Sequence, residues 1–430
     1  MSFHQVASSD AILGPDPWPR RGARAESDRF AFGALLAFLA IFILAPQTLV
    51  PALAPLRIAL VSAVFALGAF ALGRLATSRP LTIAAPEIRL AGALFAWAAL
   101  SVPFALWRGG AASVLTGLFL RTLIVFWLLC NLVNTADRLR QVALTLSLLA
   151  APLAVTAIVQ FLHGAPDGSR IQGYDAPLTS NPNDLALMLN VVLPLTVALA
   201  LVPDPPLPRV VLGGLAALSG IGVILTFSRA GFLTLAATSL CWLRRLGRNR
   251  ALEIGLLAVV VVMIAVPLLP SGYVGHLETI ANMDSDRTGS AQERWRDMGA
   301  ATAYALMHPV FGTGIGMNQL ALNEVRGATW TMVHNVYLQI AVELGVPGVV
   351  LFVLLLRAAR RSAREARAAA AAARHRGVEV IADGVAIGLV GFFVASLFHP
   401  VAYHAYFYLL AALAVASKAL AGGRSAEAAA

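Results

Sequence analysis

Charged residues are scarce in this chain, at 13% of 430 residues, while 59% of the residues are hydrophobic. Soluble proteins carry roughly 25% charged residues, so this composition excludes an ordinary soluble fold and indicates a polytopic membrane protein. Cysteine is scarcer still: Cys130 and Cys241 both lie inside apolar runs, without CxxC spacing. We therefore expect neither a disulfide framework nor a cysteine-ligated metal site.

Apolar runs long enough to cross a bilayer, roughly 17–25 residues each, recur along the chain. They predict an all-α fold of about twelve transmembrane helices, at residues 30–49, 53–73, 90–106, 114–133, 142–162, 184–203, 210–227, 230–243, 252–270, 335–356, 380–398 and 401–420. Most of the 32 basic residues collect in alternate connections, which places both termini in the cytoplasm by the positive-inside rule. Topology thus accounts for the net charge of +10, and we expect no nucleic-acid partner.

The predicted spans divide the chain into five parts. A cytoplasmic tail, 1–29, precedes nine transmembrane helices in 30–270. A large external loop follows at 271–334, then three more helices in 335–421 and a short cytoplasmic tail, 422–430. This loop is the longest part of the chain between two spans, and it has room for structure of its own.

The large external loop carries helix and turn signals. Ser290 to Glu293 matches a capping box, and Trp295, Met298 and Leu306 follow at helical spacing, predicting a surface helix with that face apolar. The loop then reads FGTGIGMN from Phe311. No strand-helix-strand unit surrounds these glycines, so we interpret them as permitting close backbone approach rather than as a dinucleotide site.

A histidine stands at the external end of the tenth predicted span. Behind His334, the side chains of Asn335, Gln339 and Glu343 follow at i, i+4 and i+8, which predicts one polar stripe facing the interior of the bundle. A neutral imidazole with a pKa of about 6.5 can take a proton from a hydroxyl group. Glu343 lies roughly 13 Å deeper by the rise per residue and serves as a buried polar link. The alternative is that His334 only orders the loop.

Nine basic residues lie where topology does not require them, and all nine are arginine: Arg57, Arg108, Arg121, Arg170, Arg229, Arg287, Arg294, Arg296 and Arg326. The guanidinium group is suited to forked binding of phosphate or carboxylate. Arg229 lies in a tight external turn that pins it near the membrane surface. Arg121 lies about seven residues inside a span, where snorkelling to the surface is the alternative to a binding role.

Two further external features have more than one interpretation. Asn181-Pro182-Asn183-Asp184 opens the sixth span, with Asn183 or Asp184 able to cap the helix. His399 and His404 bracket the last external turn, but no carboxylate or cysteine lies near them in the sequence, so a metal site there is the less favoured reading. Asp284, Asp286 and Asp297 are the compact acidic candidates for a metal, and we interpret them as solvated loop residues. We expect no cofactor or metal.

Several motifs occur in order around the large loop: RIQG at Arg170, NPND at Asn181, FSRAG at Phe227, ERW at Glu293, FGTGIGMN at Phe311 and HNVYLQIAVELGVPG at His334. Together they resemble the O-antigen ligase and polysaccharide polymerase superfamily of bacterial envelope proteins. The resemblance covers about residues 170 to 360, and the multispan architecture extends it over the whole chain. Their order, spacing and common external side carry it, since no single motif is specific.

The resemblance implies a GT-C-like, metal-independent, inverting glycosyltransferase of the bacterial inner membrane with its active site facing the periplasm. Its donor would be a glycan on undecaprenyl diphosphate, its acceptor a glycan or lipid A core, and membrane lipids would surround it. The matching essential residues are His334, Arg170 and Arg229, with Arg287 and Arg294 both in range for the loop arginine. Arg121 is a further candidate for diphosphate binding, and Asn183, Asn335 and Glu343 are candidate supporting polar residues.

The sequence separates ligase from polymerase poorly, although the form of HNVYLQIAVELGVPG favours a polymerase slightly. A small-anion transporter of the bicarbonate type, using the same arginines, is the alternative from another class. It would require polar residues through the full membrane depth, whereas here they gather on one side. A third alternative is a non-catalytic subunit of an envelope assembly.

Overall fold

The structure is a computed structural model that describes residues 28–163, 181–246 and 290–427, together with residues 171, 176, 178 and 179. Within these residues all regular structure is helical. Eight of their helices are long and apolar enough to cross a membrane, and two shorter apolar helices accompany them. The predicted all-α, polytopic membrane fold is confirmed. The predicted span at 252–270 lies outside the described residues.

The first part of the chain forms α1 (Arg29–Leu44), α2 (Pro46–Leu49), α3 (Ile58–Ala76), α4 (Pro86–Ser101), α5 (Arg108–Val114), α6 (Leu120–Leu132) and α7 (Ala136–His163). The second part forms α8 (Pro182–Leu201), α9 (Arg209–Leu225), α10 (Arg229–Arg245), α13 (Ser290–Met307), α14 (Asn318–Arg326), α15 (Val336–Ala372), α16 (Arg376–Ala395) and α17 (Ala405–Glu427). Every predicted span within the described ranges overlaps a helix. Helix α15 continues beyond the span predicted at 335–356, through the arginine-rich segment to Ala372.

Two helices, α8 and α17, form the centre of the bundle. The first half of α17 is apolar on all sides, and Tyr406, Phe407 and Tyr408 are fully buried. A helix without a polar face is stable where other helices or lipid surround it, and here other helices do. α17 packs against α15, α6 and α16, while α8 packs against α7, α9 and α16. These two helices therefore hold the helices that carry the candidate site.

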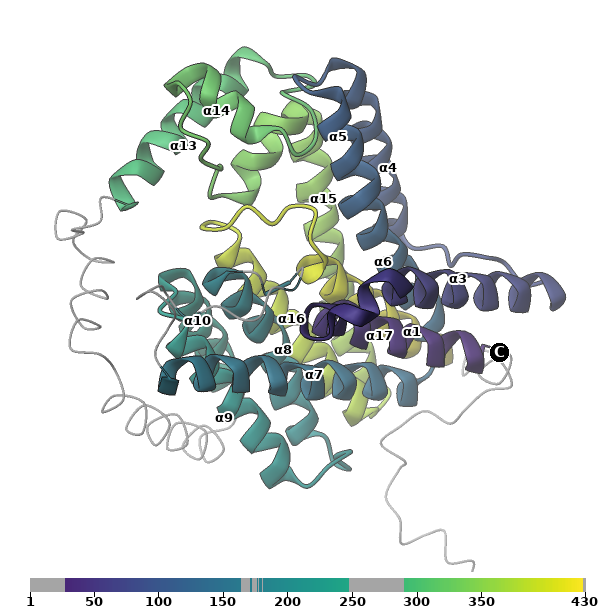
Figure 1. Ribbon diagram of the computed structural model, residues 1–430. Helices are drawn as coiled ribbons and strands as arrows, with labels where there is room; N and C mark the ends of the chain where they lie inside the picture. The colour runs from purple at the N-terminus through teal and green to yellow at the C-terminus, as the bar shows by residue number, and fades with distance from the viewer. Residues whose placement is uncertain are drawn as a thin grey trace, which may run out of the picture.

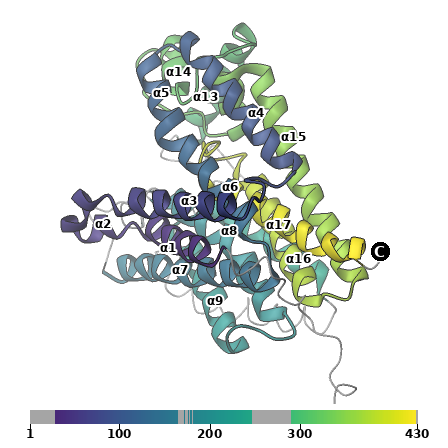
Figure 2. The ribbon, with the colours of Figure 1, turned by 90° about the vertical axis from the view of Figure 1, so that its right-hand side faces the viewer.

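Figures 1 and 2 show that the helices are not parallel rods. α4, α5 and α15 extend past the rest of the bundle, whereas α1, α3 and α7 cross their direction in both views. α13 and α14 pack on each other and against α15, at the end where α4 and α5 meet. The helices of the predicted external loop thus form a layer over the first residues of α15.

Candidate functional site

Helix α8 begins at the NPND motif, which places two polar side chains beside the site. Asn181 is the N-cap: its Oδ1 atom accepts hydrogen bonds from the backbone N–H groups of Asn183 at 2.9 Å and Asp184 at 3.0 Å. The prediction that Asn183 or Asp184 caps this helix is therefore wrong. Pro182 explains the difference, because proline favours the first helical position and leaves the residue before it as the cap. The side chains of Asn183 and Asp184 remain available for other elements.

Asn183 connects the start of α8 to the start of α10. Its Oδ1 atom accepts a hydrogen bond of 2.7 Å from Ser228 Oγ. Ser228 Oγ accepts one in turn from Gly231 N at 3.1 Å, so this serine caps α10. Arg229, the first residue of α10, is half-buried beside this contact. The NPND and FSRAG motifs, which the sequence shows separately, therefore meet at one place.

A turn at residues 396–404, between α16 and α17, connects α8 to α15. At its start, Ser396 O accepts a hydrogen bond from Val336 N at 2.8 Å, and Leu397 O accepts one from Asn335 Nδ2 at 3.2 Å. Farther along, His399 Nε2 lies 2.6 Å from Asp184 Oδ1, and both side chains are buried. Sequence reasoning noticed His399 but missed its carboxylate partner, which is 215 positions away.

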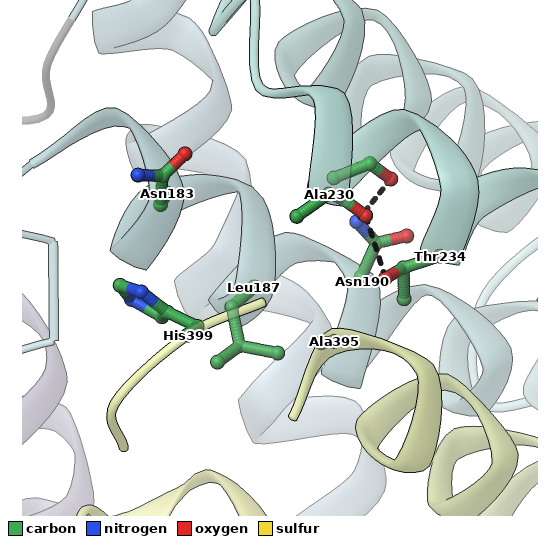
Figure 3. Close-up of a pocket in the computed structure, with 8 residues that line it drawn as sticks. Asn183, Leu187, Asn190, Ala230, Thr234, Ala395 and His399 are labelled. Atoms are coloured by element: carbon green, nitrogen blue, oxygen red, sulfur yellow. Dashed lines mark hydrogen bonds between the residues drawn. The ribbon is translucent and has the colours of Figure 1, made fainter. Parts of the chain in front are cut away.

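A small pocket opens where these elements meet, between α8, α10 and the end of α16 (Figure 3). Its lining residues are Asn183, Leu187, Asn190, Ala230, Gly231, Thr234, Ala395 and His399. In Figure 3, Asn183 and His399 lie on one side of this pocket, opposite Asn190 and Thr234. Polar groups from three separate elements therefore face a common space directly beside Arg229.

His334 lies one residue before the N-cap of α15 and is half-buried. Burial, together with the nearby Arg294 and His399, lowers the pKa of its imidazole from 6.5 to about 4. Arg294 belongs to α13, so the external layer brings a guanidinium group close to the histidine. His334 is consequently neutral at pH 7, which is the protonation state that a general base requires.

Asn335 caps α15, since its Oδ1 atom accepts a hydrogen bond from Leu338 N at 3.0 Å. Gln339 and Glu343 lie behind it on the same helix and are buried, so the polar stripe faces the interior as expected. Glu343 has no exposed surface and accepts hydrogen bonds from Gly316 N at 2.9 Å and Asn318 Nδ2 at 2.5 Å. The carboxylate therefore anchors the glycine-rich loop on α15.

The link from Glu343 leads back to the histidine. Asn318 Oδ1 accepts a hydrogen bond of 3.0 Å from the backbone N–H of Val333, the residue before His334. The Asn318 side chain thus bonds the Glu343 carboxylate through its Nδ2 atom and the backbone of Val333 through its Oδ1 atom, and these two bonds restrict the movement of the segment before α15. Glu343 supports the position of His334 through Asn318, which sequence reasoning did not identify.

Helix α15 is broken at Gly345, whose φ of 65° is left-handed. The prediction of one continuous span from 335 to 356 is wrong at this point. The glycine-rich loop supplies partners for the carbonyl groups that the break exposes: Thr313 N donates to Val342 O at 2.8 Å, and Gly314 N donates to Glu343 O at 3.0 Å. Trp97 Nε1 donates to Leu344 O at 2.9 Å.

The glycines of this loop are required by close contact, as the sequence indicates. Gly312, Gly314 and Gly316 all have positive φ, and a Cβ atom on any of them would lie within 3 Å of a neighbouring atom. At Gly314 that atom is Ala105 Cβ, at 2.3 Å. Only glycine combines this conformation with this approach.

Helix α13 leaves part of its predicted apolar face exposed and packs through another face. Trp295 and Leu306 are 59% and 77% exposed, while Ala301 and Tyr304 are buried against α14 and Val333. The buried face includes Asp297, at 2% exposure, so its interpretation as a solvated loop residue is wrong.

An ion pair from α14 explains the orientation of α13. Arg326 binds both Asp297 and Glu293, with a distance of 2.6 Å from its Nη2 atom to Glu293 Oε2. Hydrogen bonding to Arg326 lowers the pKa of the Glu293 carboxyl, and the same contact raises the pKa of Arg326. Arg326 therefore holds α13 and α14 together, and Asp297 faces inward with it.

The candidate residues from the sequence fall into three groups. His334 and Arg294 lie close enough to interact electrostatically, and Arg229 joins them through the contacts of Asn183 and the turn at 396–404. Arg170 and Arg287 lie outside the described residues. Arg121, on α6, is exposed, and no hydrogen bond or ion pair connects it to another described residue of the site.

In a comparison with protein families, residues 214–353 match the family described as O-Antigen ligase. The match begins in α9 and ends in α15, so it contains Arg229, Arg294 and His334. No curated protein matched the chain. The family match confirms the resemblance inferred from the motifs and gives no support to a small-anion transporter.

Proposed function

We propose, from the match of residues 214–353 to the O-antigen ligase family, that the chain is a membrane glycosyltransferase of the ligase or polymerase type. The protein transfers a glycan from undecaprenyl diphosphate to a sugar hydroxyl at the periplasmic face of the bacterial inner membrane. The acceptor is either a growing glycan or lipid A core. The observation that carries this proposal is the half-buried, neutral His334 beside Arg294 and bound, through the turn at 396–404, to the elements that carry Arg229.

In the proposed reaction the acceptor hydroxyl oxygen attacks the anomeric carbon of the donor glycan. The bond between that carbon and the diphosphate oxygen breaks, so undecaprenyl diphosphate leaves, and the hydroxyl proton moves to a ring nitrogen of His334. Attack on the face opposite the leaving group inverts the anomeric centre.

The leaving diphosphate gains negative charge as the bond breaks, so the main electrostatic requirement is fixed positive charge near its oxygens. Arg229 and Arg294 meet that requirement from two sides in this proposal, and Arg170 and Arg287 remain sequence-based candidates for the same role. Permanent guanidinium charges make a divalent cation unnecessary for this step. We therefore propose a metal-independent reaction.

The test is transfer by the purified protein in nanodiscs, supplied with undecaprenyl-diphosphate oligosaccharide in the presence of EDTA, with and without lipid A core. A ladder of products without core identifies a polymerase, and a single core-dependent product identifies a ligase. His334→Ala is expected to lower the rate at least about a hundredfold, the typical contribution of a general base. His308→Ala is the matched control, because His308 is an exposed histidine of the same layer that stacks on Tyr304. Absence of transfer in both assays, or full activity of His334→Ala, would refute the proposal.

A further inference from the structure

The buried contact between Asp184 and His399 is not used by the reaction proposed above. A carboxylate and an imidazole that are both withdrawn from water lose hydration, which is costly unless they pair with good geometry. Here the pairing distance of 2.6 Å is short, as expected of a charge-assisted hydrogen bond. The second carboxylate oxygen of Asp184 also accepts a hydrogen bond, from Asn181 Nδ2. This buried pair is therefore a rigid connection between two elements.

The hydrogen-bond roles of the pair follow from the chemistry of its atoms. An ionised carboxylate only accepts hydrogen bonds, so Nε2 of His399 carries the proton that Asp184 receives. The other ring nitrogen, Nδ1, is buried and has no hydrogen-bond partner among the described residues. In the described part of the chain, Asp184 is thus the group that fixes the orientation of this imidazole.

The pair lies between the two halves of the proposed site. On the α8 side, Asp184 follows Asn183, which bonds Ser228 next to Arg229. On the other side, the turn that carries His399 bonds Val336 and Asn335 directly after His334. The position of the turn therefore fixes how the histidine lies relative to the arginine.

We propose that Asp184 and His399 are positioning residues of the transfer reaction: their pairing holds the turn at 396–404, and with it His334, in register with Arg229. This inference rests on the proposed function. Neither residue touches the reacting atoms in this proposal. A displacement of about 1 Å between a base and its substrate can lower a rate about a hundredfold, so the pairing matters for the rate more than for binding.

The influence of His399 on His334 can be measured without transferase activity, through the pKa of His334. His334 faces Arg294 and Asp297 from α13 and His399 from the turn, while His404 and Asp184 face His399. Replacing His399 by a neutral residue removes one positive influence on His334. Protonation of His334 then becomes easier, and its titration moves to higher pH.

The experiment compares three replacements of His399 in the full-length protein in nanodiscs. His399→Ala should lower kcat about tenfold or more while the donor KM stays within about twofold, because diphosphate binding depends on the arginines. His399→Gln retains an N–H near the position of Nε2 and should recover most of kcat. His399→Leu fills the space without a donor and should not. Asp184→Ala should match His399→Ala, and the double variant should be no worse than either, as expected for residues that act as one unit.

Each competing role predicts a different result. If His399 were a base, the glutamine variant would be as inactive as the alanine variant; if it only filled space, the leucine variant would recover activity. Either result, or a wild-type rate in His399→Ala, overturns the inference. His404→Gln, at a half-buried histidine of the same turn, is the control and should keep the wild-type rate.

A wild-type protein without transferase activity would refute the proposed function separately. In that case the coupling of His399 to His334 is measured by NMR titration of labelled His334 in the wild type and in His399→Gln. A titration that moves to higher pH in the variant supports the coupling of the two histidines, and an unchanged titration refutes it.

Discussion

The low pKa of His334 makes a quantitative prediction for the pH dependence of transfer. Between pKa 6.5 and about 4, at 1.36 kcal/mol for each unit of pKa, the folded protein favours the neutral imidazole by about 3 kcal/mol. The neutral form is the base, so activity is lost as the pH falls through the pKa of the folded protein. The acid limb of kcat/KM, which reports the free enzyme, should therefore lie near pH 4 instead of pH 6.5.

Burial is the largest cause of the lowered pKa and Arg294 the next, so removing Arg294 should restore less than half of the difference. In Arg294→Gln the pKa of His334 rises, and the acid limb of kcat/KM should move to higher pH by about one unit. A bound diphosphate is negative and acts in the same direction. The acid limb of kcat, which reports the complex, should accordingly lie at higher pH than that of kcat/KM in the wild type.

The assay is transfer from a fluorescent undecaprenyl-diphosphate oligosaccharide between pH 3.5 and 8, with folding monitored by tryptophan fluorescence at each pH. Arg296→Gln is the matched control, because Arg296 lies on the same helix but pairs with Glu293 at the surface. A wild-type acid limb of kcat/KM near pH 6.5, or one that stays in place in Arg294→Gln, would show that His334 is not the titrating base described above.

Two further predictions concern stability. Gly314→Ala adds a Cβ atom 2.3 Å from Ala105 Cβ at a φ of 90°, whereas Gly327→Ala meets only the strain of its φ of 82° in open space. Thermal unfolding in detergent should show a loss of stability of about 1–2 kcal/mol for Gly327→Ala and a larger loss for Gly314→Ala. Equal losses in the two variants would contradict the contact with Ala105. Arg326→Ala removes the ion-pair partner of the buried Asp297 carboxylate, so it should lower the free energy of unfolding by about 3–5 kcal/mol or expose α13 to proteolysis. Arg296→Ala should lower the free energy of unfolding by less than about 1 kcal/mol. Similar protease sensitivity of both arginine variants would refute the role of Arg326.

Much of the fold could be predicted from the sequence because its signals are local. An apolar run of bilayer length identifies a helix without knowledge of its neighbours, and the described helices follow these runs. The glycines at 312, 314 and 316 were correctly interpreted, since positive φ and close approach leave few other residue types possible. The inclination of α1, α3 and α7 was not predictable, because packing rather than hydropathy determines it.

The errors and omissions at the site have a common cause. Asp184 and His399 are distant in sequence, and no periodicity connects them. Asp297 was interpreted as solvated because its ion pair with Arg326, on another helix, cannot be recognised from a hydrophobic pattern. The roles of His334, Arg229 and Arg294 remain predictions. The structure supports them by placing Arg294 near His334 and by connecting the start of α10 to that of α15 through α8 and the turn at 396–404.

The break in α15 at Gly345 divides this helix into two parts that can respond differently to the membrane. Residues 346–356 continue the predicted span, and their tilt must adapt when lipid thickness changes. Residues 336–344, with His334 just ahead of them, are fastened to the glycine-rich loop and to Glu343 and Trp97. A change of tilt below Gly345 can be absorbed at that glycine, so the histidine keeps its place in the external layer. The rate of the reaction should consequently be insensitive to the chain length of the surrounding lipids.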